Sequence, residues 1–342
     1  MRAAAGRATL RPMDRATLDW LGDRLGARVA GAERFGTGQS NPTWRLDTGA
    51  GPLVLRAKPE GRLLPKAHAV EREFRVLRAL HGGPVPVPEP VLLDEAGGPL
   101  GRAFYVMGHV EGRVLFDPTL PDEGPEGRAA IYAALARLLA DLHALDPAAA
   151  GLGDYGRAEG YFARQAALWA RQYAASVDAP SDDMGRLGAW LAGQAPAEAP
   201  PALVHGDFRL DNAILHPTEP RVLALIDWEL STLGHPMADL AYQVMQWHLP
   251  HASPLRGLGG VDRAGLGLPS DDDHLHTYAS ARGADLPDLR PWLALAAFRL
   301  AAILAGVGAR AAAGNAANPG AARAYGAMVP EVAALGLRWT RG

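Results

Sequence analysis

Apolar residues in the first hundred positions recur at strand and helix spacing, and they predict a small β-rich lobe with one helix. The stretch 35–46 fits a hairpin that turns at 36–38, and 53–58 fits the next strand. Residues 67–80 fit a helix, because the apolar positions from Val70 onward form one stripe at helical spacing. The expected order is therefore hairpin, strand and helix.

Beyond residue 112 the pattern changes to alanine-rich amphipathic segments, which predicts a mainly helical second lobe. The predicted helices cover 129–145, 161–175, 184–192 and 291–310. Before them, an apolar strand at 103–107 runs into the glycine-flanked stretch 108–112, which fits a hinge. A chain of 342 residues also exceeds the usual size of one hydrophobic core. We therefore expect an α+β fold of two lobes, residues 1–107 and 108–342.

The most informative motif is His205-Gly206-Asp207, followed by Asn212 and then by Asp227 at the end of the apolar run 222–226. The tripeptide alone fits any tight turn. In kinase catalytic loops, however, an Asp accepts the proton of the attacking hydroxyl, and an Asn five residues later binds Mg²⁺. An Asp on a following strand binds the metal at the β- and γ-phosphates. The combination predicts Asp207 as the general base and Asn212 and Asp227 as magnesium ligands.

The turn at 36–41 is a candidate cover for nucleotide phosphates, because small residues let backbone N–H groups approach an anion closely. The candidate residues are Gly36, Gly38, Gln39, Ser40 and Asn41. An ordinary hairpin turn has the same composition, and a third glycine is missing. The phosphate role therefore depends on the catalytic motif downstream.

A kinase also needs a cation on the next strand for the α- and β-phosphates, and a helical Glu that positions it. Strand alternation puts Arg56 and Lys58 on one face, and Arg56 is preferred because Lys58 abuts a proline. Glu73 falls within the apolar stripe of its helix, whereas Glu71 lies on the outer face. Because an inward carboxylate needs a partner, we expect Glu73 to hold the cation and Glu71 to be a solvated charge.

Other polar residues have structural interpretations. Asp239 opens an apolar helical segment and is expected to cap it, with bracing of the catalytic loop as a second role. The acidic run 271–273 fits the first turn of a helix capped by Ser270 better than a metal cluster. His205 is interpreted as a packing residue, and Glu229 as a candidate support of the metal site.

The segment 161–173 combines arginine, glutamine and aromatic residues. Arg164 and Arg171 are seven residues apart and so share a helix face. They either contact an anionic substrate or are solvated while the helix packs through its aromatic residues. Both interpretations stay open.

Composition excludes several classes. A net charge of −3 gives no general attraction for nucleic acid or an anionic membrane, and the absence of cysteine excludes disulfides and thiolate chemistry. The longest uncharged apolar stretch, 300–309, is about half a membrane span. The first twenty residues lack the continuous apolar core of a secretory signal. We expect a soluble, cytoplasmic protein whose partner is a small molecule.

Five stretches together resemble the aminoglycoside phosphotransferase-like kinases over nearly the whole chain. They are 35–43, 54–59, 64–74, 161–173 and 205–212. In particular they resemble the subgroup that occurs as stand-alone bacterial proteins and fused to acyl-CoA dehydrogenases in eukaryotes. The resemblance implies a protein-kinase-like bilobal fold, ATP under the 36–41 turn, and adenine bonded to backbone near Met107 and Val110. Arg56 departs from the usual Lys, although an arginine fork still suits phosphate.

The same resemblance implies ATP- and Mg²⁺-dependent phosphorylation of a small-molecule hydroxyl, and for the fused subgroup a hydroxyacyl-CoA. The short interval between Asp227 and Asp239 leaves no room for the activation loop of a protein kinase. An aminoglycoside or choline-type kinase is the alternative, and it would need an acidic pocket for its cationic substrates. A non-catalytic nucleotide-binding pseudokinase is a further alternative, and the complete catalytic set stands against it.

Overall fold

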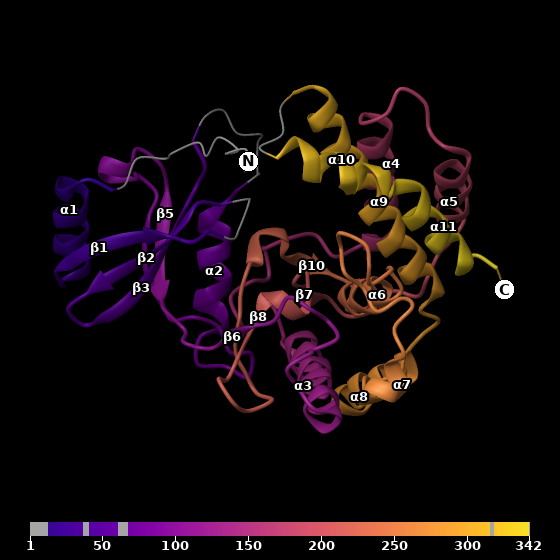
Figure 1. Cartoon of the computed structure of the whole chain (residues 1–342), viewed down its shortest axis with the longest axis horizontal. Helices are drawn as coiled ribbons and strands as arrows, with labels where there is room; N and C mark the ends of the chain where they lie inside the picture. Colours follow the sequence, from indigo (N-terminus) through magenta and orange to yellow (C-terminus); the bar gives the residue numbers. More distant parts are fainter. Residues whose placement is uncertain (1–12, 37–40, 61–67, 315–317, 342) are drawn as a thin grey trace, which may run out of the picture. The chain divides into compact units, whose positions relative to one another are not determined.

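The computed structural model describes residues 13–36, 41–60, 68–314 and 318–341. The chain divides into two compact units, Met1–Glu111 and Gly112–Gly342. The boundary falls after Glu111, whereas the sequence pattern predicts it after Met107. Figure 1 labels the helices and strands of both units.

The N-terminal unit is built on an antiparallel sheet of strand order β1-β2-β3-β5-β4. Its elements are α1 (Arg15–Leu25), β1 (Val29–Arg34), β2 (Thr43–Thr48), β3 (Gly51–Ala57), α2 (Val70–Leu80), β4 (Pro90–Asp94) and β5 (Phe104–Gly108). The predicted hairpin is present, but its first strand precedes Phe35. The prediction missed this strand because its sequence, VAGAER, has few apolar residues. It also missed α1 and β4.

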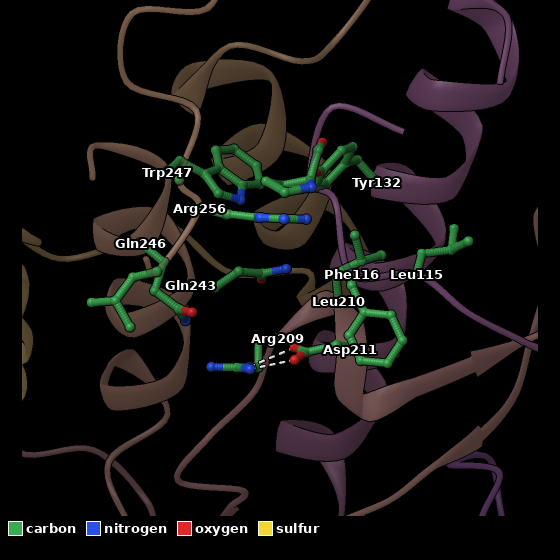
Figure 2. Close-up of a pocket in the computed structure, with 13 residues that line it drawn as sticks. Leu115, Phe116, Tyr132, Arg209, Leu210, Asp211, Gln243, Gln246, Trp247 and Arg256 are labelled. Carbon is green, nitrogen blue, oxygen red and sulfur yellow. Dashed lines mark hydrogen bonds and ion pairs between the residues drawn. The ribbon is translucent and has the colours of Figure 1, made fainter. Parts of the chain in front are cut away.

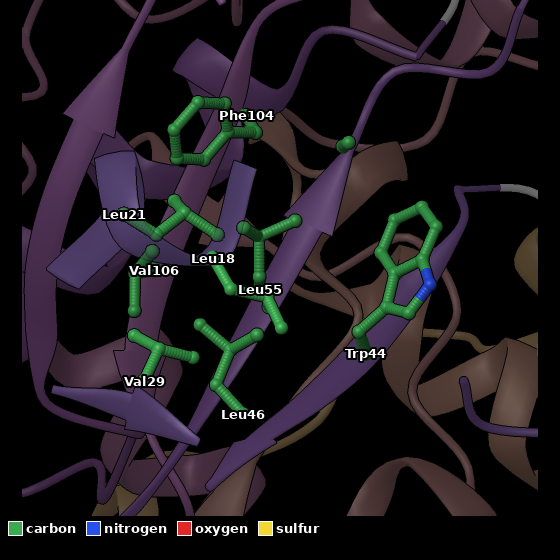
Figure 3. Packing of buried hydrophobic residues seen from close by; sticks show 9 residues of the cluster. Leu18, Leu21, Val29, Trp44, Leu46, Leu55, Phe104 and Val106 are labelled. Atoms are coloured by element: carbon green, nitrogen blue, oxygen red, sulfur yellow. The ribbon is translucent and has the colours of Figure 1, made fainter. Parts of the chain in front are cut away.

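The two faces of this sheet have different partners. Leu55 of β3 and Val106 of β5 point to one face, where they form a core with Leu18 and Leu21 of α1 (Figure 3). Because side chains alternate along a strand, Arg56 lies on the opposite face, the side of the sheet that contacts α2. The alternation of side chains along β3 therefore places Arg56 on the face that contacts α2.

The C-terminal unit is mainly helical. Its helices are α3 (Pro125–Ala144), α4 (Tyr161–Ala174), α5 (Asp182–Ala192), α6 (Met237–Trp247), α7 (Arg263–Leu266), α8 (Asp271–Arg282), α9 (Arg290–Ala312), α10 (Pro319–Ala327) and α11 (Val329–Arg338). Its strands are β6 (Arg113–Val114), β7 (Ala202–Val204), β8 (Ala213–Leu215), β9 (Val222–Leu225) and β10 (Thr232–Gly234). They form a two-stranded sheet, β10-β7, and a three-stranded sheet, β6-β8-β9.

Helix α9 is the central helix of this unit. Helices α4, α6, α10 and α11 pack against it, as Figure 1 shows. Among the described residues it alone is long and apolar enough to cross a membrane, but 67% of its most apolar window is buried inside the fold. Its apolar length is therefore that of a core helix.

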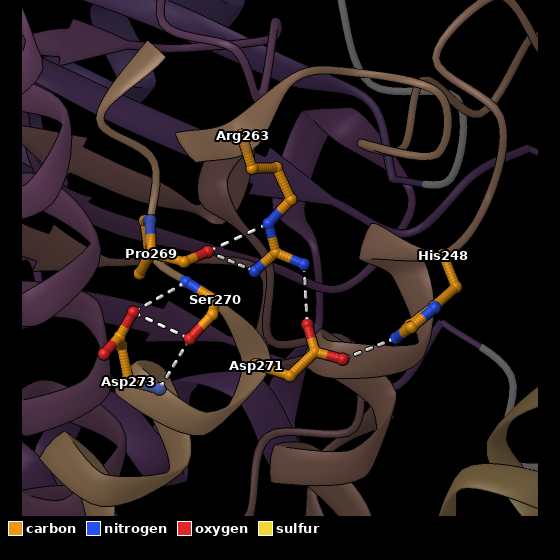
Figure 4. Close-up of polar contacts among 6 residues, drawn as sticks. All are labelled: His248, Arg263, Pro269, Ser270, Asp271 and Asp273. Atoms are coloured by element: carbon orange, nitrogen blue, oxygen red, sulfur yellow. Dashed lines mark hydrogen bonds and ion pairs between the residues drawn. The ribbon is translucent and has the colours of Figure 1, made fainter. Parts of the chain in front are cut away.

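The acidic run in the first turn of α8 has the structural role that the sequence predicted. Ser270 and Asp273 form a reciprocal capping box, and the Asp271 carboxylate binds His248 at 2.6 Å and Arg263 at 2.7 Å (Figure 4). Across the described ranges, no three histidine or acidic side chains gather as a metal cluster. These aspartates stabilise the start of the helix and its connection to α7.

Candidate active site

In the N-terminal unit, Glu73 of α2 is the centre of a buried polar cluster. Its side chain is only 1% exposed, so its charge requires partners. Arg56 Nε lies 2.9 Å from Oε2, Tyr105 donates to Oε2 at 3.1 Å, and Asn41 Nδ2 donates to Oε1 at 2.7 Å. His68 Nδ1 lies 2.9 Å from the Asn41 oxygen. The predicted pairing of Arg56 with Glu73 is therefore present.

The second candidate cation has a separate partner. Lys58 Nζ lies 2.9 Å from Glu71, whose side chain is 37% exposed. Glu71 was expected to be a solvated charge, and its ion pair with Lys58 was not anticipated. The two strand cations thus hold different carboxylates, and that of Arg56 is the buried one.

The predicted nucleotide contacts are only partly within the described residues. Gly38, Gln39 and Ser40 lie outside them, whereas Gly36 ends the described segment after β1. Asn41 is 2% exposed, and its side chain holds Glu73. Met107 lies in β5, and Val110 follows that strand. The adenine contact at these two residues stays a prediction.

In the C-terminal unit, Asp207 and Asn212 are joined directly. The Asn212 amide Nδ2 donates to the Asp207 carbonyl oxygen at 2.9 Å and to its carboxylate Oδ2 at 3.1 Å. Because the amide nitrogen is used on Asp207, the opposite end of the amide presents its oxygen. The spacing of five residues between Asp207 and Asn212 thus lets the Asn212 amide bond back to Asp207 and close a compact loop.

His205 connects this loop to the segment of Asp227. Its Nε2 lies 2.9 Å from the Ile226 carbonyl oxygen, and its Nδ1 accepts from the Asp207 N–H at 3.2 Å. These contacts assign the tautomer with hydrogen on Nε2. Asp227 itself has a φ of 66°, a left-handed conformation that aspartate tolerates better than most residues. His205 is thus a packing residue, as expected, and it also fixes the backbone beside both aspartates.

Asp239 braces the catalytic loop and does not cap its own helix. Its carboxylate accepts from the His205 N–H at 2.6 Å and from the Gly206 N–H at 2.8 Å, while Pro236 occupies the helix N-cap. Burial acts to raise the pKa of Asp239, but hydrogen bonds from His143 and Gly206 outweigh it, so the pKa lies below its usual value. The carboxylate therefore stays ionised. The expected cap is wrong, and the second role, the brace, is the observed one.

Gly206 is required by this geometry. Its φ is 85°, and a Cβ placed there would lie 2.5 Å from the Leu230 carbonyl oxygen. Its N–H binds Asp239, and its carbonyl oxygen accepts from Arg299 of α9 at 2.5 Å. The peptide groups before Asp207 are thus held from two helices.

Sequence reasoning missed Arg299 and Tyr242. The Arg299 guanidinium lies 5.5 Å from the Trp169 ring centroid and 5.2 Å from that of Tyr242. Burial first, and then the charge of Asp207, raise the pKa of Tyr242, so the tyrosine hydroxyl stays protonated near that carboxylate. No short motif marks these residues, because they come from two helices that follow the loop in sequence.

The two predicted substrate arginines of α4 differ in environment. Arg164 Nε donates to the Glu159 carbonyl oxygen at 3.0 Å, and its guanidinium also binds the Arg157 carbonyl oxygen. Arg171 is exposed in the last turn. Arg164 thus stabilises the turn before α4, and the substrate role of both residues stays a prediction.

The chain matches the model of the phosphotransferase enzyme family over residues 31–292, a span that includes both clusters. The chain belongs to this phosphotransferase family. It is a small-molecule kinase, and the recognition of that family from the sequence motifs is confirmed.

Several relatives of this phosphotransferase are much longer proteins. Acyl-CoA dehydrogenase family member 11 of Gallus gallus is 42% identical over 320 residues, which cover 92% of this chain and 41% of that protein. Probable acyl-CoA dehydrogenase IBR3 of Arabidopsis thaliana is 43% identical over 322 residues, 87% of this chain and 38% of that protein. The chain thus spans about two fifths of the length of these curated relatives.

Solved structures confirm the fold of the phosphotransferase. A candidate aminoglycoside phosphotransferase from Ralstonia eutropha JMP134 has a TM-score of 0.86 and 40% identity, covering 96% of this chain and 98% of that one. Aminoglycoside phosphotransferase APH(4)-Ia, solved with AMP-PNP and hygromycin B, has a TM-score of 0.61 at 17% identity, covering 96% of this chain and 100% of that one. The predicted α+β, protein-kinase-like fold is confirmed.

Proposed function

We propose that this phosphotransferase uses ATP and Mg²⁺ to phosphorylate the hydroxyl of a hydroxyacyl-CoA. The observation that carries the proposal is the pair of loops that hold Asp207 and Asp227, joined through the His205 ring. Phosphoryl transfer depends on positioned charges more than on covalent chemistry. A rigid connection between a proton acceptor and a metal-binding carboxylate is therefore the feature that this reaction needs.

The donor set fits magnesium. Mg²⁺ prefers oxygen ligands and is held in kinases by one or two carboxylates together with substrate phosphates. Asp227 offers a carboxylate, and Asn212 offers its amide oxygen because its nitrogen is used on Asp207. When bound, the metal would neutralise charge on the phosphates.

The protein's own groups have separate tasks in this proposal. Asp207 accepts the proton of the acceptor hydroxyl, and the Asn212 amide orients that carboxylate. Arg56, held by Glu73, binds the nucleotide phosphates. Asn41 supports Glu73, and the stretch 36–41, as the sequence predicts, covers the nucleotide phosphates.

The acceptor class is inferred from the relatives. The curated relatives are named acyl-CoA dehydrogenases, and this chain matches about two fifths of their length. A kinase that is fused to an enzyme acting on acyl-CoA is expected to share that enzyme's class of substrate. The exposed Arg171 is a candidate contact for the anionic part of such a molecule.

An aminoglycoside or choline-type acceptor is the second candidate. It is favoured by the Ralstonia eutropha protein, which is described as a candidate aminoglycoside phosphotransferase and is 40% identical. A polycationic acceptor would require acidic residues around it.

Substrate-dependent ADP release separates these candidates. The panel is hydroxybutyryl-CoA, kanamycin, hygromycin B and choline, each with Mg·ATP, and Asp207→Asn is the control for contaminating kinases. We expect ADP release with hydroxybutyryl-CoA only. Release with an aminoglycoside or choline, but not with the acyl-CoA, would replace the proposed function by the second candidate.

A further inference from the structure

A small cavity of the C-terminal unit lies beside the catalytic loop (Figure 2). Arg209, Leu210 and Asp211, which follow Asp207 in the loop, form one side of it. Helix α6 forms another side with Gln243, Gln246 and Trp247. The cavity measures about 70 Å³, well below the roughly 300–1,000 Å³ that encloses a whole ligand. It can therefore take only a part of a substrate.

Gln243 is the notable polar group of this cavity. The residue is 3% exposed, and its Oε1 lies 3.0 Å from Nε2 of His274. The His274 Nδ1 is buried without a hydrogen-bond partner. A ring with hydrogen on Nε2 leaves only a lone pair unpaired there, whereas the other tautomer would leave a costly unpaired N–H. His274 thus donates to Gln243, and the orientation of the amide is fixed.

The amide nitrogen of Gln243 consequently faces the cavity. Figure 2 shows this nitrogen at the end of the side chain that extends between Arg256 and Arg209. Within the described residues, no protein acceptor binds it. Gln246, one turn further along α6, differs because its Nε2 donates to the Tyr242 carbonyl oxygen at 3.3 Å. Of these two glutamines, Gln243 is the one whose two amide N–H groups are both available to a ligand.

The remaining walls suit a short acyl chain. Trp247 and Tyr132 meet edge to face with ring centroids 5.2 Å apart, and Leu115 and Leu210 add apolar surface. The Asp211 carboxylate is already paired with Arg209. A cation would therefore find no unpaired carboxylate among the residues that line this cavity.

We propose that this cavity is the carbonyl-recognition subsite of the acceptor, and that Gln243 donates a hydrogen bond to the acyl carbonyl oxygen. The proposal rests on the proposed function and adds a residue that sets its specificity. Its position is suitable because Arg209, Leu210 and Asp211, which line the cavity, follow Asp207 closely in the catalytic loop. The same loop thus carries the proton acceptor and one side of the subsite.

The test compares Gln243→Leu and Gln243→Glu with Gln194→Leu as the control, because Gln194 lies outside the cavity and its amide donates to the Trp190 carbonyl oxygen at 3.3 Å. The glutamate keeps an oxygen for His274 but replaces the N–H donor, so it carries the test if the leucine variant folds poorly. Both Gln243 variants should lower kcat/KM for hydroxybutyryl-CoA roughly ten-fold or more, with the ATP KM unchanged. The control should change neither value beyond two-fold. Equal effects of the leucine substitutions at 243 and 194, or an unchanged kcat/KM in both Gln243 variants, would overturn the proposal.

A binding measurement separates failure of this proposal from failure of the proposed function. Calorimetric titration with butyryl-CoA, which has the carbonyl but no hydroxyl to phosphorylate, does not depend on turnover. Gln243→Leu and Gln243→Glu should weaken its binding roughly ten-fold relative to Gln194→Leu. Equal binding by all of these variants would reject the proposed subsite even if hydroxybutyryl-CoA is phosphorylated. Weakened binding without any turnover would keep the subsite and reject the phosphorylation of that acceptor.

Discussion

Each unit of the molecule has one deeply buried carboxylate at its candidate site, and the two have different partners. Glu73 is bound by the side chains of Asn41, Arg56 and Tyr105. Asp239 is bound mainly by the backbone N–H groups of the catalytic loop. The first carboxylate therefore orients a charged side chain, whereas the second determines the path of the main chain. Loss of the first should weaken nucleotide use, and loss of the second should destabilise the loop itself.

The largest expected effect on stability is that of Asp239→Asn. An amide cannot accept at both positions that the loop N–H groups occupy, so one donor would be left buried and unpaired. Breaking a buried charged interaction costs about 3–5 kcal/mol of unfolding free energy. Urea unfolding followed by circular dichroism would measure it. Asp183→Asn, at the half-exposed Asp183–Arg186 pair, should change stability by less than about 1 kcal/mol. Equal losses in the two variants would contradict the bracing role.

Glu73→Gln should come next, because it removes the charge that holds Arg56 but keeps the size of the side chain. Charge-assisted hydrogen bonds contribute about 1.5–3 kcal/mol, so kcat/KM for ATP should fall roughly ten- to hundred-fold. Glu71→Gln is the matched control on the same helix and should have little effect. Initial rates over a range of ATP concentrations would measure both variants.

The strand cations provide the complementary comparison. Arg56→Ala should impair ATP use more than Lys58→Ala, because Arg56 is the partner of the buried carboxylate. The reverse ranking of kcat/KM for ATP would transfer the phosphate role to Lys58.

Acid should destabilise the C-terminal unit through its buried histidines. Burial lowers the pKa of His274 from 6.5 to about 4, so between these values the unfolded chain binds more protons than the folded one. Stability is then fully present above pH 6.5 and lost as the pH falls toward 4, by about 2 kcal/mol at pH 5. Urea unfolding at pH 7 and pH 5 would show the loss. His274→Asn should reduce the difference between the two pH values, and an unchanged difference would reject this cause.

The smallest expected effect is that of Arg299→Met, which removes the donor to the Gly206 carbonyl oxygen. It should lower kcat roughly ten-fold with both KM values unchanged, because the arginine positions Asp207 and binds neither substrate. Arg299→Lys should restore part of kcat. Arg310→Met, at an exposed arginine of the same helix, should leave kcat unchanged. A change in KM for either substrate would contradict a pure positioning role.

The same comparison explains which parts of the site the sequence could predict. Glu73 and Arg56 were predictable because helix and strand periodicities place them on facing surfaces. Asp207, Asn212 and Asp227 were recognisable from their spacing. Asp239 was expected mainly as a cap, because its actual partners are backbone N–H groups that leave no signature in the sequence. Arg299 and Tyr242 depend on the packing of α6 and α9 around the loop, which local patterns do not specify.

The fold shows a similar division. The larger amphipathic helices and the strand that leads into the catalytic loop were predicted close to their observed bounds. Strand β1 has few apolar residues, and β4 directly follows a proline-rich stretch, so neither was predicted. These strands are established by pairing with β2 and β5, which is information from distant residues.

The central claim is that Asp207 is the proton acceptor of a small-molecule kinase, and the Asp207→Asn variant tests it most directly. Turnover would be measured as ADP release with saturating Mg·ATP and the accepted hydroxyl substrate, alongside nucleotide affinity by calorimetry. The account predicts a fall in kcat of roughly 10²–10⁴-fold, as for the loss of a general base, with nucleotide affinity retained. A kcat within a few-fold of the wild-type value would contradict the account.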